Sequence, residues 1–414
     1  MNVHSRLRCQ SPRRPRILFI AEAVSLAHVV RLAMLAESLD PSRYDVWFAS
    51  ARFPRLVFAG TTFHRRRIES RSPERTLQRV ARGQPPWVEA ELARYVEDDL
   101  RLLDELRPDL VVGDFRLSLA VSAPIRRTPC ATLINAYWSP HAVRDAFPIP
   151  EHPLVRVLGI RRVARRWRAV LPFVFRRFAR PLNRLRKRYG LAPVGSLLEA
   201  LTFGDHTLYP DIPELAPTRG LPADHHYLGT LSWSPRLPLP AAWDRMDHTR
   251  PLVYATVGSS GDLRVLEAVL GAARRLPITM LIATAGRCTP RAVADNVWLT
   301  DFVPGDVIAR RAALVICNGG STTSYQALEA GTPVLGLPSH LDQYLAAEAV
   351  ARAGAGLYLR SGAATSRAIA DAATRLLFEE RFRLATSRLQ AALAAWDARS
   401  RFREFVASAI NPVT

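Results

Sequence analysis

Cysteine and long apolar stretches are both scarce in this chain, and their scarcity excludes several classes of protein. The 414 residues include four cysteines with neither metal-binding spacing nor a disulfide pattern, so Cys130 and Cys317, in apolar runs, are expected to be buried thiols. No apolar run approaches the ~20 residues that span a bilayer. The run that begins at Ile17 soon meets Glu22, which predicts a β-strand and not a cleavable signal. We therefore expect a cytoplasmic protein.

Carboxylates and lysine are also few, so the chain is strongly basic. Aspartate and glutamate number 37 against 57 arginines and lysines, the formal charge is +20, and Lys187 is the single lysine. Part of this excess reflects a general drift toward arginine, but residues 152–198 contain no acidic side chain. A basic field of this kind attracts anionic surfaces. Its members are Arg156, Arg161, Arg162, Arg165, Arg166, Arg168, Arg176, Arg177, Arg180, Arg184, Arg186, Lys187 and Arg188.

Apolar residues recur at near-helical spacing within this basic segment, and Pro172 and Pro181 are expected to divide it into pieces. The pattern is typical of an amphipathic helix that lies on an anionic membrane, which would make the protein peripheral to the inner face of the cell membrane. An equally good interpretation is the solvated outer face of a helix pair belonging to the core. Nucleic-acid binding is not predicted, because no module of stacking aromatic side chains accompanies the arginines.

Strand-like and helix-like periods alternate in two parts of the chain, residues 16–135 and 252–337. This α/β rhythm predicts two parallel, doubly wound, Rossmann-like sheets, which bind ligands at the carboxyl ends of their strands. Prolines interrupt residues 205–250, so the domain boundary is expected there. The expected divisions are an N-terminal domain at 1–215, a Pro-rich linker at 216–250, a second domain at 251–395 and a final helix at 396–414.

A glycine turn follows the short apolar run 313–317, and a helical pattern begins immediately after it. Glycines let the backbone approach an anion, while free N–H groups and the helix dipole face it, so a phosphate-binding turn is predicted. A second apolar run, 333–338, precedes Asp342 and Gln343, whose polar groups suit the hydroxyls of a sugar. The predicted phosphate turn consists of Asn318, Gly319, Gly320, Ser321, Thr322 and Thr323.

Together these segments resemble the donor-binding signature of the family 1 glycosyltransferases, UDP-glycosyltransferase-like enzymes that include those of the macrolide and antibiotic type. Asn318 stands at the signature's histidine, Thr322 at a glycine and Gln326 at a glutamate, while Asp342 and Gln343 match the sugar-contacting pair. The resemblance implies the GT-B fold, in which two Rossmann-like domains face a cleft and the last helix crosses back onto the first domain. It also implies a nucleoside-diphosphate sugar as co-substrate, with no cofactor and no metal, and the chain lacks an Asp-x-Asp triplet at a strand end.

Further donor contacts follow from the same resemblance. Ser259 and Ser260 lie in a glycine–serine turn that is expected near the donor phosphates. Phe302 and Val303 stand where the family stacks an aromatic ring on the nucleobase, although Phe302 is equally well interpreted as a core aromatic. Gln326 is neutral where the family has a carboxylate, which favours tolerance of a deoxyribose. The donor is therefore expected to be a UDP or a dTDP sugar.

Two polar residues stand at strand ends in the first domain. His28 begins the helical pattern after the first strand, and Asp114 follows the strand-like residues 109–113. The resemblance assigns His28 as the general base and Asp114 as the carboxylate that orients it; Ala27 and Arg31 depart from the family's glycine and proline. Imidazole is suited to accept a hydroxyl proton near neutral pH. The alternatives are a helix-start histidine without a catalytic role and an aspartate that caps the next helix.

The predicted activity is inverting transfer of a sugar to an acceptor hydroxyl. The acceptor is expected to be a small molecule or a lipid-like compound, but the sequence does not identify the residues that bind it. Two alternatives within enzymes are a membrane-associated transferase of the peptidoglycan-precursor type and a GT-B sugar epimerase. A third is a catalytically weakened homologue that only binds nucleotide sugars, and the departures at Asn318, Thr322 and Gln326 favour it.

Overall fold

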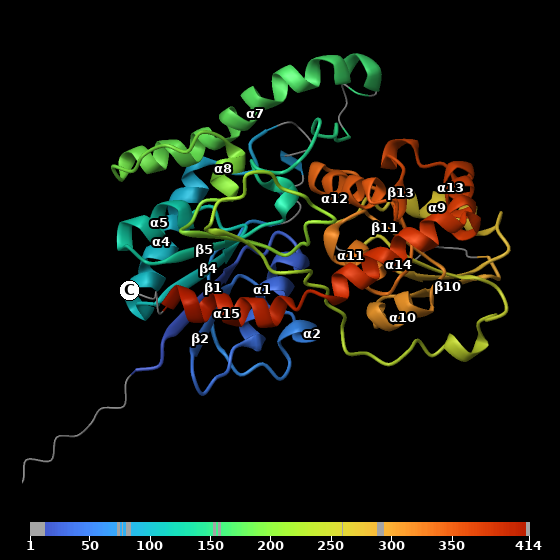
Figure 1. Cartoon of the computed structure of the whole chain (residues 1–414), viewed down its shortest axis with the longest axis horizontal. Helices are drawn as coiled ribbons and strands as arrows, with labels where there is room; N and C mark the ends of the chain where they lie inside the picture. The colour runs from blue at the N-terminus through green and yellow to red at the C-terminus, as the bar shows by residue number, and fades with distance from the viewer. Residues whose placement is uncertain are drawn as a thin grey trace, which may run out of the picture.

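The computed structural model describes residues 13–72, 75–76, 78–79, 84–151, 155, 159–258, 260–287 and 294–410. Two α/β domains lie side by side, each built around a parallel sheet (Figure 1). This arrangement confirms the α/β class and the two Rossmann-like domains expected from the sequence. Among the described residues, no helix is both long enough and apolar enough to cross a membrane.

The first domain contains a seven-stranded parallel sheet in the order β3-β2-β1-β4-β5-β6-β7. In β1, Ile17 and Phe19 pack toward α1 and the C-terminal helix α15, while Leu18 and Ile20 pack toward α4 and α5. A strand covered on both faces must be apolar throughout, which is why β1 reads as a continuous apolar run. The strands are β1 (Arg16–Ala21), β2 (Asp45–Ser50), β3 (His64–Arg67), β4 (Leu110–Asp114), β5 (Cys130–Leu133), β6 (His206–Tyr209) and β7 (His225–Tyr227).

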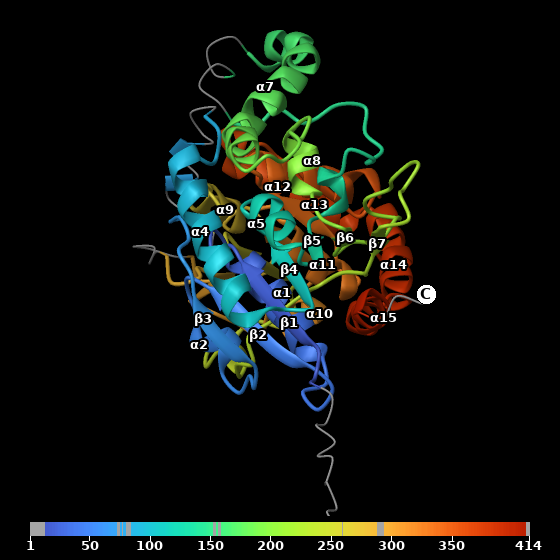
Figure 2. The ribbon, with the colours of Figure 1, turned by 90° about the vertical axis from the view of Figure 1, so that its left-hand side faces the viewer.

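Helices cover both faces of this sheet, as the turned view in Figure 2 shows. The strand β7 lies within the range 216–250 that the sequence assigns to a linker, and it extends the first sheet by pairing with β6. The helices of this domain are α1 (Leu26–Ser38), α2 (Arg55–Phe58), α4 (Glu89–Leu106), α5 (Leu119–Arg126), the short η1 (Ala136–Trp138), α7 (Ile160–Arg188) and α8 (Leu197–Leu201).

The second domain has a six-stranded parallel sheet in the order β10-β9-β8-β11-β12-β13. Its strands are β8 (Leu252–Thr256), β9 (Thr279–Ala283), β10 (Val297–Thr300), β11 (Leu314–Cys317), β12 (Val334–Gly336) and β13 (Gly356–Tyr358). Its helices are α9 (Val265–Ala273), α10 (Gly305–Arg311), α11 (Ser321–Glu329), α12 (Leu341–Arg352), α13 (Ser366–Phe378) and α14 (Glu380–Ala394), with short turns at η2 (Trp243–Arg245) and η3 (Ser361–Ala363).

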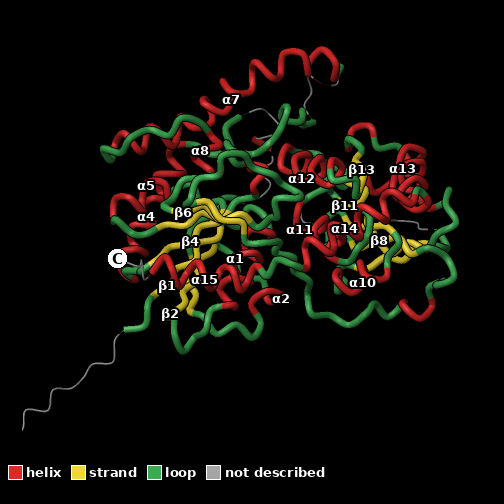
Figure 3. Tube along the Cα trace, viewed as in Figure 1, coloured by secondary structure: helices red, strands yellow, loops and turns green. Residues whose placement is uncertain are grey.

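The last helix, α15 (Ala398–Ile410), returns to the first domain (Figures 1 and 3). Phe402 is fully buried, and its ring centroid lies 5.8 Å from that of Phe19 in β1. Burial of an aromatic side chain of this size removes 150–250 Å² of surface from water, so this contact ties the two ends of the chain together.

The basic segment forms one long helix, α7, and the expectation that Pro172 and Pro181 divide it was wrong. Each proline removes one backbone hydrogen bond, but the apolar face from Leu171 to Leu185 is buried against the first domain and offsets that loss. The N-terminal part of α7, residues 160–170, contains no fully buried side chain and extends beyond the sheet (Figure 1).

Candidate active site

The carboxyl ends of β1 and β4 bring a histidine and an aspartate together. The two strands are parallel neighbours, with Ala21 paired to Asp114, and α1 starts a few residues after β1. His28 Nδ1 lies 2.8 Å from Asp114 Oδ1. The Asp114 side chain is fully buried, 18% of the His28 side chain is exposed, and Phe115 stacks on the imidazole at 4.9 Å. When Asp114 accepts the Nδ1 proton, Nε2 becomes the proton acceptor of the ring.

Arg31, one turn after His28 on α1, also contacts Asp114. Its Nε donates to Oδ2 at 3.1 Å and its Nη2 donates to Oδ1 at 2.9 Å, so both carboxylate oxygens are held. The Arg31 side chain is 5% exposed. Burial by itself lowers the pKa of Arg31, but Asp114, Tyr137 and Asp342 together outweigh this effect and the net pKa is raised. The guanidinium is therefore charged, and it donates to both oxygens of Asp114.

A chain of hydrogen bonds continues from Arg31 into the second domain. Arg31 Nη1 donates to Asn135 Oδ1 at 2.6 Å, and Asn135 Nδ2 donates to Asp211 Oδ1 at 2.9 Å. The Tyr325 hydroxyl of α11 donates to the same carboxylate. Burial raises the pKa of Asp211, and these donors oppose that effect. The His28–Asp114 pair is thus linked through side chains to the helix that follows the glycine turn.

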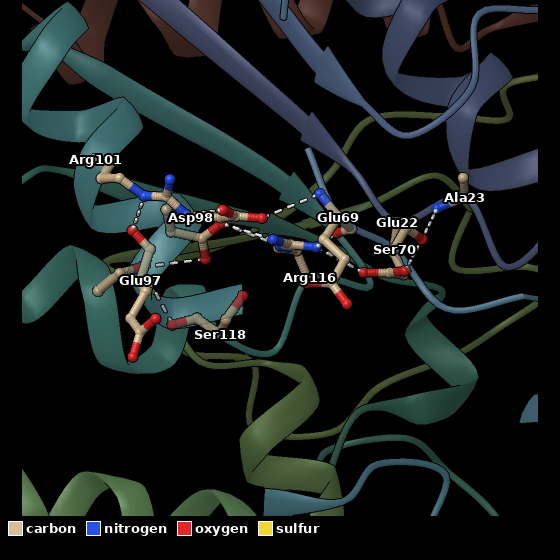
Figure 4. Close-up of polar contacts among 11 residues, drawn as sticks. Glu22, Ala23, Glu69, Ser70, Glu97, Asp98, Arg101, Arg116 and Ser118 are labelled. Atoms are coloured by element: carbon tan, nitrogen blue, oxygen red, sulfur yellow. Dashed lines mark hydrogen bonds and ion pairs between the residues drawn. The ribbon is translucent and has the colours of Figure 1, made fainter. Parts of the chain in front are cut away.

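A second buried ion cluster lies at the same sheet edge, centred on Arg116 (Figure 4). Arg116 is fully buried; its Nη1 donates to Glu22 Oε2 at 3.1 Å and to the Glu69 carbonyl at 2.7 Å. Its Nε donates to Asp99 Oδ1 at 3.1 Å, and its guanidinium lies 4.3 Å from the centre of the Tyr95 ring. One side chain therefore joins the end of β1, helix α4 and the loop after β3, and this holds the region around His28 in place.

The glycine turn after β11 has the geometry that a phosphate cradle requires. Gly319 adopts φ +74°, and a Cβ atom there would lie 3.0 Å from Ala347 Cβ, so a side chain is excluded by conformation and by space. The first hydrogen bond inside α11 runs from Ser324 N to Gly320 O, so the N–H groups of Ser321, Thr322 and Thr323 precede it. These groups lie at the positive end of the helix.

Asn318, which stands at the signature's histidine, is turned toward its neighbours. Its Oδ1 accepts from Gly320 N at 3.0 Å, and its Nδ2 donates to Ser260 Oγ at 3.4 Å. The amide therefore shapes the turn, and the backbone N–H groups are left as the main donors for an anion. Ser259 lies outside the described residues.

Asp342 is reached by side chains of the first domain. Trp138 Nε1 donates to Asp342 Oδ1 at 2.7 Å, and the Tyr137 hydroxyl donates to the same oxygen at 3.3 Å. Both donors belong to η1, which follows β5. The second oxygen of Asp342 has no contact of this kind among the described residues, so the carboxylate is oriented at the domain interface with capacity to accept from a hydroxyl.

The other donor candidates differ in how accessible they are. Gln343 is buried. Its Oε1 accepts hydrogen bonds from the N–H and the hydroxyl of Ser339, which stabilises the start of α12. Gln326 Nε2 donates to the Trp233 carbonyl at 3.1 Å. Phe302 is 41% exposed and is therefore not a core aromatic, whereas its neighbour Val303 is buried.

A cavity of about 1280 Å³ lies between the domains. It is lined by α1 and α2 of the first domain and by α10, α11 and residues 232–237 on the other side, and Gln326 lies on its wall. Gln326 Oε1 would lie 2.6 Å from a Cβ atom at position 305, so Gly305 makes room for this amide.

Four residues of the site were not identified from the sequence: Arg31, Asn135, Asp211 and Trp138. Arg31 is three residues after His28 and so on the same face of α1, which was the only local signal. The contacts of the other three join residues 76 to 204 positions apart in the chain. Periodicity contains no information about contacts at that separation.

The chain is similar to several known proteins. Residues 267–400 match the family model of the erythromycin biosynthesis protein CIII-like C-terminal domain. A PGL/p-HBAD biosynthesis rhamnosyltransferase of Mycobacterium bovis is 46% identical over 378 residues, covering 91% of this chain and 84% of the relative. A PGL/p-HBAD biosynthesis glycosyltransferase of Mycobacterium tuberculosis is 46% identical over 379 residues, covering 91% and 88%.

Solved structures show the same fold. The spinosyn rhamnosyltransferase SpnG complexed with thymidine diphosphate superposes with a TM-score of 0.68 at 20% identity, over 94% of this chain and 99% of that one. With two parallel-sheet domains, a glycine turn before α11 and relatives of this identity, the chain belongs to the GT-B family 1 glycosyltransferases, and it is a glycosyltransferase.

Proposed function

We propose that the protein is an inverting glycosyltransferase in which His28 is the general base. His28 Nε2 takes the proton from an acceptor hydroxyl as the oxygen attacks the anomeric carbon of the donor. The new carbon–oxygen bond forms on the face opposite the diphosphate, the bond to the phosphate oxygen breaks, and the nucleoside diphosphate leaves. The observation that carries this proposal is the 2.8 Å contact between His28 Nδ1 and Asp114, which leaves Nε2 to accept the proton. The anomeric configuration of the product, measured by NMR against that of the donor, tests it.

The diphosphate would lie against the glycine turn. The N–H groups of residues 321–323 and the dipole of α11 offset its charge, and the proposal assigns this role to them and not to a divalent ion. Asp342, oriented by Trp138, would accept a hydrogen bond from a sugar hydroxyl. The relatives named as transferases favour sugar transfer over the epimerase alternative.

The donor that we propose is a dTDP sugar, with rhamnose as the first sugar to test. Gln326 is uncharged and its Nε2 is already bonded to the Trp233 carbonyl, so one amide oxygen remains to accept from a ribose hydroxyl. A deoxyribose needs fewer acceptors than a ribose. The relatives named rhamnosyltransferases and the SpnG complex with thymidine diphosphate support the same choice.

Addition of dTDP is expected to raise the melting temperature of the protein, and substitution Gly319→Ala is expected to abolish that rise. At a hundredfold excess over Kd, binding stabilises the native state by about 2.7 kcal/mol, which corresponds to a rise of roughly 5 °C for a domain of this size. A Cβ atom at residue 319 would meet Ala347 Cβ at 3.0 Å and the Gln343 carbonyl at 3.3 Å, so α12 would have to move away from the turn. Differential scanning fluorimetry with dTDP, UDP and GDP measures the effect.

The matched control is Gly331→Ala, because Gly331 also has φ +74° but lies at the other end of α11. This variant should be less stable than the wild type and still show the full rise with dTDP. A Gly319→Ala protein that keeps the rise would contradict the phosphate site.

We also propose that α7 contacts an anionic membrane, which would bring a lipid-like acceptor to the enzyme. Helix α7 contains no acidic residue, and most of its arginines are exposed. Val170 is 47% exposed and Phe173 is 61% exposed, beside these arginines. Apolar side chains can enter the headgroup region while the guanidinium groups bind anionic headgroups.

Vesicles that contain phosphatidylglycerol are expected to bind the protein, whereas phosphatidylcholine vesicles are not. Each basic residue near an anionic surface contributes about 1 kcal/mol, so the triple change of Arg161, Arg165 and Arg168 to glutamine should weaken partitioning roughly 100-fold in co-sedimentation. The control removes the same charge from α14, through glutamine at Arg381, Arg383 and Arg388, and should bind as the wild type does. Binding that is unaffected by anionic lipid, or weakened equally by both triple changes, would contradict a membrane face on α7.

A further inference from the structure

Arg31 makes more contacts in the His28 environment than a simple ion pair needs. Its Nε and Nη2 bind the two oxygens of Asp114 at 3.1 and 2.9 Å, and its Nη2 also lies 3.2 Å from His28 Nδ1. Its third nitrogen, Nη1, donates to Asn135 Oδ1 at 2.6 Å. All three nitrogens of a rigid, planar group are therefore engaged, which fixes the plane of the Asp114 carboxylate relative to the imidazole.

The position of Arg31 is itself fixed from the second domain. Asn135 also donates to Asp211, and Asp211 accepts from Tyr325 of α11, the helix that begins at the glycine turn. A shift of the Arg31 guanidinium in any direction would therefore lengthen at least one of its hydrogen bonds to Asp114 or Asn135. A residue that served only to neutralise Asp114 would need neither Asn135 nor this anchoring.

The charged and titratable groups around the pair come from four elements. His28 faces Asp114 from β4 and Arg31 from its own helix. Arg31 faces Asp114, and it also interacts electrostatically with Tyr137 of η1 and Asp342 of α12. Arg31 is the single cation in this set of described groups, and it interacts with three carboxylates, Asp114, Asp342 and, beyond Asn135, Asp211.

We propose that Arg31 is a positioning residue for sugar transfer, which holds Asp114 oriented so that His28 carries its proton on Nδ1 and presents Nε2 to the acceptor. This inference rests on the proposed role of His28 as the general base. Because Arg31 binds both oxygens of the Asp114 carboxylate, this group can accept the Nδ1 proton of His28 from one direction only. That restriction selects one tautomer and one orientation of the imidazole ring.

The test compares two variants. Arg31→Met removes the charge and all three donor nitrogens, whereas Arg31→Lys keeps the charge but lacks the planar guanidinium that binds two oxygens at once. With Met, kcat for sugar transfer is expected to fall about 10²-fold while KM for the donor changes little, since a small misplacement of a reacting group has that cost. With Lys, kcat should recover in part.

The tautomer gives a readout that does not depend on activity. In long-range ¹H–¹⁵N NMR spectra, with the His28 signals assigned by their loss in His28→Gln, the wild-type ring should carry its proton on Nδ1 and the Met variant should show a mixture. Arg186→Met is the matched control, because Arg186 is equally buried but donates to the carbonyls of Ala120 and Ala192 and not to a carboxylate. It should lose stability without changing the tautomer.

An unchanged tautomer in the Met variant overturns the proposal, whatever happens to kcat, because Arg31 would then act other than through His28. A changed tautomer with unchanged kcat also overturns it. If His28→Gln retains transfer activity, the proposed function fails and this inference fails with it, while a tautomer change in Arg31→Met would still show the physical link. The two failures are therefore distinguishable.

Discussion

Replacement of His28 by alanine is expected to lower kcat for sugar transfer by about 10²- to 10⁴-fold, the usual contribution of a general base. The acceptor hydroxyl is a poor nucleophile until its proton leaves, and His28 Nε2 is the acceptor that the Asp114 contact leaves open. The rise in melting temperature with dTDP should be unchanged, because the imidazole is not part of the glycine turn. The measurement is release of dTDP from dTDP-rhamnose with a panel of phenol and alcohol acceptors.

The control for this experiment is His64→Ala. His64 is also a histidine of the first domain, but its side chain is 59% exposed and stacks on Trp47. This variant should transfer sugar at the wild-type rate. Near-wild-type transfer by His28→Ala, with the same acceptor, would refute the proposed mechanism.

Replacement of Arg116 by methionine is expected to destabilise the protein by about 3–5 kcal/mol, the cost of removing one partner from a buried ion pair. Glu22 and Asp99 are both buried, and Arg116 is the cation that contacts their carboxylates. Methionine fills most of the volume of the arginine stem, so the loss is electrostatic and not a cavity effect. Guanidinium unfolding followed by circular dichroism would measure it.

This destabilisation should be smaller at pH 5 than at pH 8. Burial raises the pKa of Asp99, and Arg116 opposes that rise, so its removal raises this pKa further. A folded state that keeps a proton to higher pH than the unfolded chain gains stability as the pH falls. Arg101→Met on α4 is the control, since Arg101 has 76% of its side chain exposed and its pair with Asp98 should contribute at most about 1 kcal/mol. Equal effects of the two changes would show that the buried cluster has no special role.

Much of the fold could be predicted from local patterns, and the misses have a common cause. Strands β1 and β9 are apolar after their first residue, and both lie in the two parts of the chain where strand-like and helix-like periods alternate. Strand β3 has the sequence His-Arg-Arg-Arg and β7 has His-His-Tyr, which no apolar pattern reveals. Both are edge strands of the first sheet, so each pairs with a neighbouring strand on one side only. The side chains of an edge strand need not all be covered by apolar residues. Their existence depends on pairing with β2 and β6.

The candidate site divides in the same way. His28, Asp114 and the glycine turn could be recognised because strand ends of a parallel sheet meet at one edge. Arg31 appeared in the sequence only as a departure from the family's proline. The contact of its guanidinium with both oxygens of Asp114 could not be inferred, because the two residues lie 83 positions apart in the chain.

The amino-acid sequence by itself determined two βα series, the turn chemistry between strand and helix, and the identity of the groups that would bind a phosphate or accept a proton. Those properties depend on residue type and on spacing within about twenty positions. Only the tertiary structure decided which charges are buried and with what partner: Arg31 on Asp114, Arg116 between Glu22 and Asp99, and Trp138 on Asp342. Burial is a property of the whole packed chain, and a charge without water is stable only where packing brings an opposite charge or a hydrogen-bond partner to it.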